Sequence, residues 1–118
     1  MKEKIFINFS NHPADKWSKK QISAAQKYGK VTDIRFPVVD EAGDEDYIRN
    51  LADEYLAKIM KYEPAAVMCQ GEFCLSYAII TALKEKGVTV LAACSKRIVK
   101  ETEDEKKSFF VFERFREY

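Results

Sequence analysis

The sequence predicts one α/β domain in which helices cover both faces of a mostly parallel β-sheet. Short apolar runs rich in strand-forming residues alternate along the chain with segments whose apolar residues recur at helical spacing. This alternation is typical of parallel sheets, because parallel strands are joined by crossovers that usually contain a helix. A chain of 118 residues with 47% hydrophobic residues suits one domain with its own core. We therefore expect residues 1–118 to form a single three-layer domain.

The expected strands are short and mostly apolar. They cover residues 4–10, 31–39, 65–69 and 88–94, and the alternating C-terminal segment adds a closing edge strand or a hairpin that ends near Phe115. Pro37 places the second strand near a sheet edge, because proline cannot donate a hydrogen bond to a neighbouring strand. The charged residues 101–107 are expected to form a loop between two C-terminal strands.

The expected helices lie between these strands and carry recognisable signals at their ends. They cover residues 18–28, 44–61 and 73–86. Ser18 and Gln21 have the spacing of a capping box, whose side chains bind free backbone N–H groups of the first turn. Gly29 and Gly87 follow the first and third helices, where glycine commonly ends a helix. The acidic residues 44–46 suit the positive end of the second helix.

Composition and motifs exclude several classes of function. A net charge of +1 is too small for the broad positive field that binds duplex DNA. The apolar runs are shorter than the ~18 residues of a membrane span, and the N-terminus resembles a first strand more than a signal peptide, so we expect a cytoplasmic protein. The three cysteines, Cys69, Cys74 and Cys94, have neither disulfide nor zinc-site spacing. We expect no metal and no cofactor, since dinucleotide and P-loop motifs are also missing from the sequence.

The expected strand order is 2-1-3-4, with the C-terminal segment added beyond the fourth strand. In such sheets ligands bind outside the carboxyl ends of the strands, where the order reverses. That position lies between the first and third strands. The segments that follow the first, third and fourth strands, "NFSNHP", "QGEF" and "SKR", should meet there.

The candidates that are not cations come mostly from the first two segments. Ser10 and Asn11 could donate hydrogen bonds to phosphate, or they could cap the turn that follows the strand. Gln70 offers both a donor and an acceptor to a ligand. Gly71 would let a ligand approach the backbone closely, and Glu72 either faces the ligand or stabilises the start of a helix. The alternative for this whole segment is a plain turn between a strand and a helix.

The charged candidates come from the first and last segments. His12 is the only histidine and could act as a general acid or base, although a loop histidine can equally be an ordinary surface residue. Lys96 and Arg97 follow Ser95 directly after a buried strand, where cations can bind phosphate and stabilise charge on its oxygens. The alternative is a solvated pair of surface charges.

Three stretches of the sequence resemble a known group of proteins. "FINFSNHP", "VMCQGEFCLSYAIITALKEKGVTVLAACSKR" and "FVFERFREY" are similar to the small, single-domain CRISPR-associated proteins of the CARF-like and ring-nuclease group, which occur beside type III CRISPR systems. The resemblance covers most of the chain. It implies a Rossmann-like domain, usually a homodimer, that binds cyclic tetra- or hexa-adenylate.

The resemblance also implies a reaction. Several members of the group cleave the ring without a metal, by attack of a ribose 2′-hydroxyl on the neighbouring phosphorus. It implies ligand-binding roles for one set of residues and catalytic roles for another. The ligand-binding set is Ser10, Asn11, Gln70, Gly71, Glu72 and Ser95, and the catalytic set is Lys96 and Arg97. His12 could supply a general acid for the leaving 5′-oxygen, a role that follows from its chemistry and not from the resemblance. The alternatives are a sensor or sponge that binds the ring without cutting it, and a generic Rossmann-like protein that binds another nucleotide or a protein.

Overall fold

The structure is a computed structural model that describes residues 3–118. Its elements in chain order are β1 (Ile5–Ser10), the 3-10 helix η1 (Ala14–Lys16), α1 (Lys19–Gln26), β2 (Lys30–Arg35), α2 (Glu45–Met60), β3 (Ala66–Cys69), α3 (Phe73–Glu85), β4 (Thr89–Glu101) and β5 (Lys106–Glu117). Among these helices, none is both long enough and apolar enough to cross a membrane.

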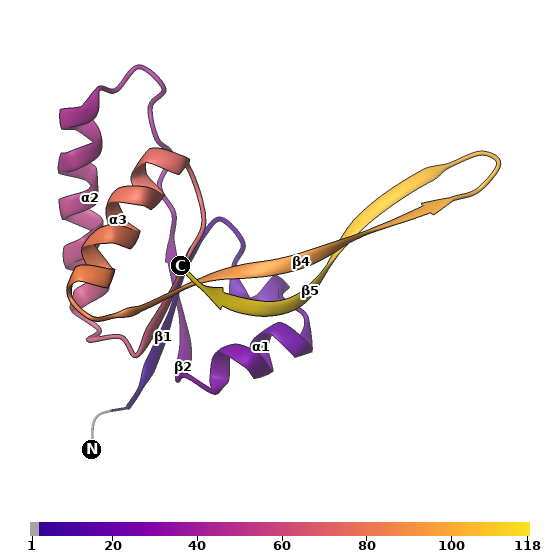
Figure 1. The fold of residues 1–118 in the computed structure, drawn as a ribbon, viewed down its shortest axis with the longest axis horizontal. Helices are drawn as coiled ribbons and strands as arrows, with labels where there is room; N and C mark the ends of the chain where they lie inside the picture. Colours follow the sequence, from indigo (N-terminus) through magenta and orange to yellow (C-terminus); the bar gives the residue numbers. More distant parts are fainter. Residues whose placement is uncertain (1–2) are drawn as a thin grey trace.

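The five strands form one mixed sheet in the order β2-β1-β3-β4-β5. β1 pairs in parallel with β2 and β3, and β3 pairs in parallel with β4. Only β5 is antiparallel, and it forms a hairpin with β4 at the sheet edge (Figure 1). The expected order of the first four strands is therefore confirmed, and so is the position of the C-terminal segment beyond the fourth.

Helices cover both faces of the sheet, and each face has its own core cluster. α2 and α3 pack on one face, where Phe9, Val67 and Leu83 are fully buried (Figure 1). α1 packs on the other face, where Phe6 and Leu91 are buried with Phe115 of the last strand. Neighbouring residues of one strand belong to different clusters because side chains alternate between the two faces of a sheet.

The first two helices begin where the sequence predicts. The side chain of Ser18 accepts a hydrogen bond from the backbone N–H of Gln21 at 3.2 Å, and Asp44 caps α2 in the same way. The predicted end of the first helix at Tyr28 is wrong, since α1 ends at Gln26. Gly29 has another function, because a Cβ there would lie 2.5 Å from the carbonyl oxygen of Lys4. Glycine is needed for this close approach of two backbones.

Gly87 ends the third helix as predicted. Its φ angle is +77°, which lies in the left-handed region that glycine enters without strain. The predicted second strand is too long, because β2 ends at Arg35 and not at Val39. Phe36 then turns into the core against Phe9, with ring centroids 4.7 Å apart, and Pro37 follows without an N–H group for further pairing.

The largest departure from the predicted fold is the length of the hairpin. β4 does not end at Cys94, because β5 pairs with it as far as Glu101. "SKR" is therefore part of a strand and not a turn, and the connecting loop comprises only residues 102–105. We call residues 95–112 the arm, since this part of the hairpin projects from the body of the protein (Figure 1).

Candidate functional site

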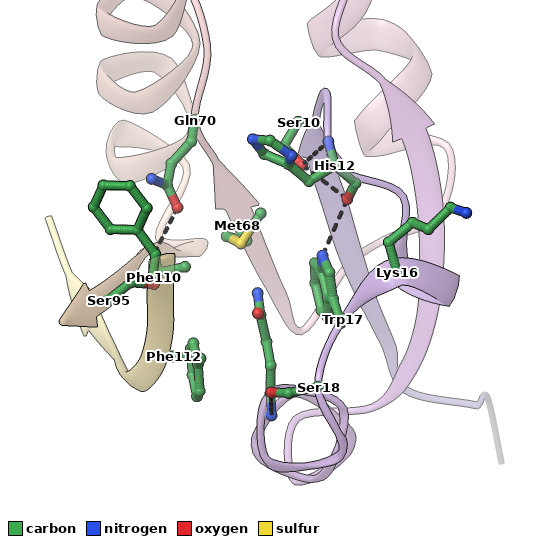
Figure 2. A pocket seen from close by; sticks show the side chains of 12 residues that line it. Ser10, His12, Lys16, Trp17, Ser18, Met68, Gln70, Ser95, Phe110 and Phe112 are labelled. Atoms are coloured by element: carbon green, nitrogen blue, oxygen red, sulfur yellow. Dashed lines mark hydrogen bonds between the residues drawn. The ribbon is translucent and has the colours of Figure 1, made fainter. Parts of the chain in front are cut away.

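A cavity of about 560 Å³ lies at the carboxyl ends of β1 and β3, on the face that α1 covers. We call it the central cavity. Figure 2 shows Gln70, Ser95 and Phe110 on one side of it, His12 and Trp17 on the other, and Met68 between them. The residues that complete its lining are Ser10, Lys16, Ser18, Gln21, Ala93 and Phe112. It therefore lies next to the strand pair at which the sequence predicts a ligand site.

A buried amide holds the loop after β1. The Nδ2 group of Asn8 donates to the carbonyl of His12 and to Oδ1 of Asp33, both at 2.9 Å. The Oδ1 atom of Asn8 accepts a hydrogen bond from the hydroxyl of Ser10 at 2.6 Å. The single hydrogen of the Ser10 hydroxyl is thus used inside the protein, which matches the alternative in which Ser10 caps the turn.

Two further hydrogen bonds fix the segment between β1 and α1. The indole N–H of Trp17 donates to the carbonyl of His12 at 3.0 Å, and the backbone N–H of Ala14 donates to the carboxylate of Asp33 at 3.2 Å. These bonds anchor η1 and one wall of the central cavity to β2. The imidazole of His12 is exposed on that wall and can meet a ligand (Figure 2).

Gln70 connects the end of β3 to β4. Its Oε1 atom accepts a hydrogen bond from the backbone N–H of Ala93 at 2.6 Å, and the backbone N–H of Gln70 donates to the carbonyl of Phe9. The side chain therefore extends the hydrogen-bonding pattern of the sheet one step beyond the last residue of β3. Figure 2 shows its Nε2 group turned toward Phe110, and Gln70 lines both this cavity and a second one beside α3.

Gly71 and Glu72 serve the turn between β3 and α3. A Cβ at Gly71 would lie 2.5 Å from the ring of Phe36, so glycine is required there by packing. The carboxylate of Glu72 accepts a hydrogen bond from the backbone N–H of Cys74 and caps α3. The alternative of a structural turn accounts for both residues. Gly71 also borders a second, mostly apolar cavity of about 690 Å³ beside the exposed Phe73.

The faces of the arm follow from the register of the hairpin. Glu113 is an extra residue of β5, because Cys94 pairs with Arg114 while Ser95 pairs with Phe112. This bulge explains how Phe112 and Phe115, three residues apart, both reach the core on the α1 side. β4 has no such interruption, so its alternate residues continue along one face from the body into the arm.

Lys96 and Arg97 therefore lie on opposite faces. Arg97 shares the face of Ser95, which lines the central cavity, and it pairs with Phe110, which lines the cavity as well. Lys96 pairs with Val111 on the other face. Directly opposite residues of an antiparallel pair share a face, so Arg97 lies on the same face of the arm as Phe110, although Arg97 does not itself line the cavity.

The predicted site residues are only partly brought together. Ser10, His12, Gln70 and Ser95 all line the central cavity. Asn11 lines a separate cavity of about 310 Å³ beside Asp33. The other predicted residues that do not line the central cavity are Gly71, Glu72, Lys96 and Arg97. Sequence reasoning missed the aromatic walls. Trp17, Phe110 and Phe112 line the central cavity and are not among the predicted site residues.

The charge of the central cavity is distinctive. Lys16 and His12 are the only residues of its lining that can carry a charge, and the described lining contains no carboxylate. Residues 3–118 also contain no group of three or more His, Cys, Asp or Glu side chains that could hold a metal ion. Aromatic rings, amides, hydroxyls and cations together favour a ligand with an aromatic part and a negative charge.

Burial accounts for the chemistry of Cys69, at the end of β3. Its side chain is fully buried, and this burial raises the pKa of the thiol to about 12. The thiol is therefore neutral at physiological pH, and it is a core residue and not a nucleophile. The other two cysteines are also free thiols, of which Cys74 is exposed.

Comparison with protein families gives one match. The model described as "Uncharacterized protein MJ1673 family" matches residues 4–116, which is nearly the whole chain. The comparison with curated proteins gives no match.

Proposed function

This chain belongs to the MJ1673 family, and we propose that it binds a cyclic oligoadenylate in the central cavity and cleaves the ring. The observation that carries the proposal is the lining of the cavity, in which aromatic walls and hydrogen-bond donors occur without any carboxylate. Nucleotides combine a flat aromatic base with an anionic phosphate, so they match both properties. Cleavage in the cytoplasm would switch off type III CRISPR signalling.

The proposal assigns the parts of a nucleotide to different walls. Trp17 and Phe110 offer aromatic surface to adenine, and Phe110 is 70% exposed and therefore accessible to a ligand. Arg97, on the same face as Phe110, offers a guanidinium to the phosphate.

The ligand is shared between two copies of the chain. A cavity of about 560 Å³ is in the usual range for a drug-sized ligand, and a ring of four adenylates is larger than that. A ring with an even number of identical units can have twofold symmetry, which matches a twofold-symmetric homodimer with one cavity from each copy. The Rossmann-like CARF domain is part of this proposal, supported by the strand order β2-β1-β3-β4 and by a cavity at the carboxyl ends of the strands.

The reaction is an internal transfer. A ribose 2′-oxygen attacks the adjacent phosphorus and gives its proton to water, the bond from phosphorus to the 5′-oxygen breaks, and the products carry a 2′,3′-cyclic phosphate and a 5′-hydroxyl. Arg97 stabilises the charge that develops on the phosphate oxygens. His12 donates a proton to the leaving 5′-oxygen. The fixed loop after β1 supports this step, because Asn8 and Trp17 donate to the backbone carbonyl of His12 and the hydroxyl of Ser10 accepts from its backbone N–H.

A cleavage assay with paired variants tests the proposal. The wild-type protein should convert labelled cyclic tetra- or hexa-adenylate to linear products in the presence of EDTA. Arg97→Ala should lower the rate at least about tenfold, because a donor to the developing charge is removed. Lys96→Ala removes a neighbouring positive charge from the opposite face of the arm and should change the rate less than about twofold.

Each possible result has a definite meaning. A wild-type rate for Arg97→Ala would exclude Arg97 from the mechanism, and an equal loss in both variants would mean that Arg97 acts only through its general positive charge. Binding of the ring without cleavage would favour the sensor or sponge. If the folded protein neither binds nor cleaves the ring, the nuclease and the sensor or sponge are both contradicted. The remaining alternative is then a generic nucleotide- or protein-binding domain.

A further inference from the structure

The side-chain amide of Gln70 is held in one orientation by the sheet. β3 ends at Cys69, whereas β4 continues past Ala93. The backbone N–H of Ala93 therefore needs an acceptor beyond the end of β3, and Oε1 of Gln70 supplies it at 2.6 Å. The reverse orientation would place two donors, Nε2 of Gln70 and the N–H of Ala93, against each other.

This orientation leaves the donor end of the Gln70 amide free, on the side of Phe110 (Figure 2). Its Nε2 group carries two hydrogens and has no hydrogen-bond partner within residues 3–118. A ligand atom that meets it must accept a hydrogen bond, and an anionic oxygen is the strongest such acceptor.

The surroundings of Gln70 favour an anion as well. Ser95 lines the same side of the cavity and has no hydrogen-bond partner for its side chain among the described residues. Arg97 follows two residues later on the same face of β4, and within residues 3–118 it forms no ion pair. Phe110, opposite Arg97, adds an exposed ring. One uncharged and one charged donor group thus border the same aromatic surface.

We propose that Gln70 and Arg97 form an oxyanion subsite that binds a phosphate group of the ligand next to Phe110. The subsite rests on the proposed function only in taking the ligand to be a nucleotide. In this subsite Gln70 binds phosphate and not the edge of adenine. A nucleoside, which has no phosphate, should therefore not bind. Its chemistry is that of any phosphate ester, so a single nucleotide is a sufficient probe.

One substitution removes the hydrogen-bond donor of the Gln70 side chain and keeps its acceptor. Gln70→Glu keeps an oxygen acceptor for the N–H of Ala93 but replaces the donor by a carboxylate oxygen, which repels phosphate. We expect the affinity for adenosine 5′-monophosphate to fall at least about tenfold in calorimetry. Gln26→Glu makes the same change of charge at the far end of α1, outside the central cavity, and should leave the affinity unchanged within about twofold. Adenosine should bind far more weakly than the monophosphate to the wild-type protein.

A spectroscopic measurement on the wild-type protein does not depend on the folding of a variant. In ¹H–¹⁵N spectra the side-chain NH₂ signals of Gln70 should shift with adenosine 5′-monophosphate and should not shift with adenosine. Unshifted signals at saturation, an unchanged affinity of folded Gln70→Glu, or no binding of the monophosphate at all would each overturn the subsite.

The same variants distinguish this subsite from the proposed function. If cyclic oligoadenylate binds equally well to the wild-type protein and to Gln70→Glu, the subsite is wrong and the proposed function stands. If the monophosphate binds through Gln70 but no cyclic oligoadenylate binds, the subsite stands and the proposed function is wrong.

Discussion

Polar side chains at the ends of the strands first bind the protein's own backbone. Asn8 donates to the carbonyl of His12 in the loop after β1 and accepts from the hydroxyl of Ser10, and Gln70 uses its oxygen on β4. Buried polar groups without partners are costly, so these bonds are needed for stability whatever the ligand. Only the part of such a side chain that is not bonded within the protein can bind a ligand. For Gln70 this part is a donor.

Cys69 gives a prediction at the same scale. Its pKa is about 12 in the folded protein against an ordinary value of 9.0. The unfolded chain therefore loses this proton at lower pH than the folded protein does, so the free energy of unfolding should fall as pH rises above about 9. Chemical denaturation between pH 8 and 10.5 should show this slope, and Cys69→Ala should reduce it. Lysines and tyrosines also titrate in this range. An identical slope in the variant would therefore mean that such groups, and not Cys69, cause the pH dependence.

The arm is the element that departs most from an ordinary α/β sheet. It is a ribbon of two strands beyond the last contact of β4 with β3, and two-stranded ribbons are marginally stable alone. Its exposed apolar residues include Phe109 and Phe110. Phe112, at its base, is buried in the core and anchors it to the body.

Shortening the arm tests how much of it the fold requires. Replacing residues 99–108 by Asn-Gly leaves the pair Ile98–Phe109 next to a favourable two-residue turn. Because neither core cluster contains a residue of that range, the melting temperature should stay within about 5 °C of the wild-type value. Replacing residues 95–112 removes the buried Phe112 as well and should lower it much further. A large fall in the melting temperature when only residues 99–108 are replaced would mean that the outer arm is packed against something in solution.

At the scale of the whole molecule, the sheet brings together segments that are far apart in the chain. The loop after β1, the end of β3 and the base of the arm meet at one cavity, although about 60 residues separate the first two. The charged groups of the protein nearly cancel, with 20 Lys and Arg against 19 Asp and Glu. Attraction of an anion is therefore local, and it arises because carboxylates are missing from this lining.

The proposed dimer gives a prediction of stoichiometry. If two cavities share one ring, calorimetry should find one cyclic tetra-adenylate for every two chains, whereas adenosine 5′-monophosphate should bind once per chain. Light scattering of the saturated protein should give twice the mass of one chain. One ring per chain, or a monomer at saturation, would contradict the shared site.

Much of this architecture is predictable because local periodicity determines the type of each element. The alternation of apolar strands and amphipathic helices leads to the strand order 2-1-3-4, and this order places the polar ends of the first and third strands side by side. Four predicted residues, Ser10, His12, Gln70 and Ser95, consequently line one cavity. Capping signals such as Ser18 depend on neighbours in the sequence and are equally visible.

The sequence by itself thus determined the order of the elements and the edge of the sheet at which polar residues gather, since both depend on patterns within short segments. Only the tertiary structure decided where β4 ends, because the length of a strand depends on a partner, and here β5 carries the pairing through "SKR" to Glu101. The same pairing separates Arg97 from Lys96 by face. Likewise, the ring of Phe36, 35 residues earlier in the chain, is what requires a glycine at Gly71. Contacts between distant segments decide such details, and no local pattern encodes them.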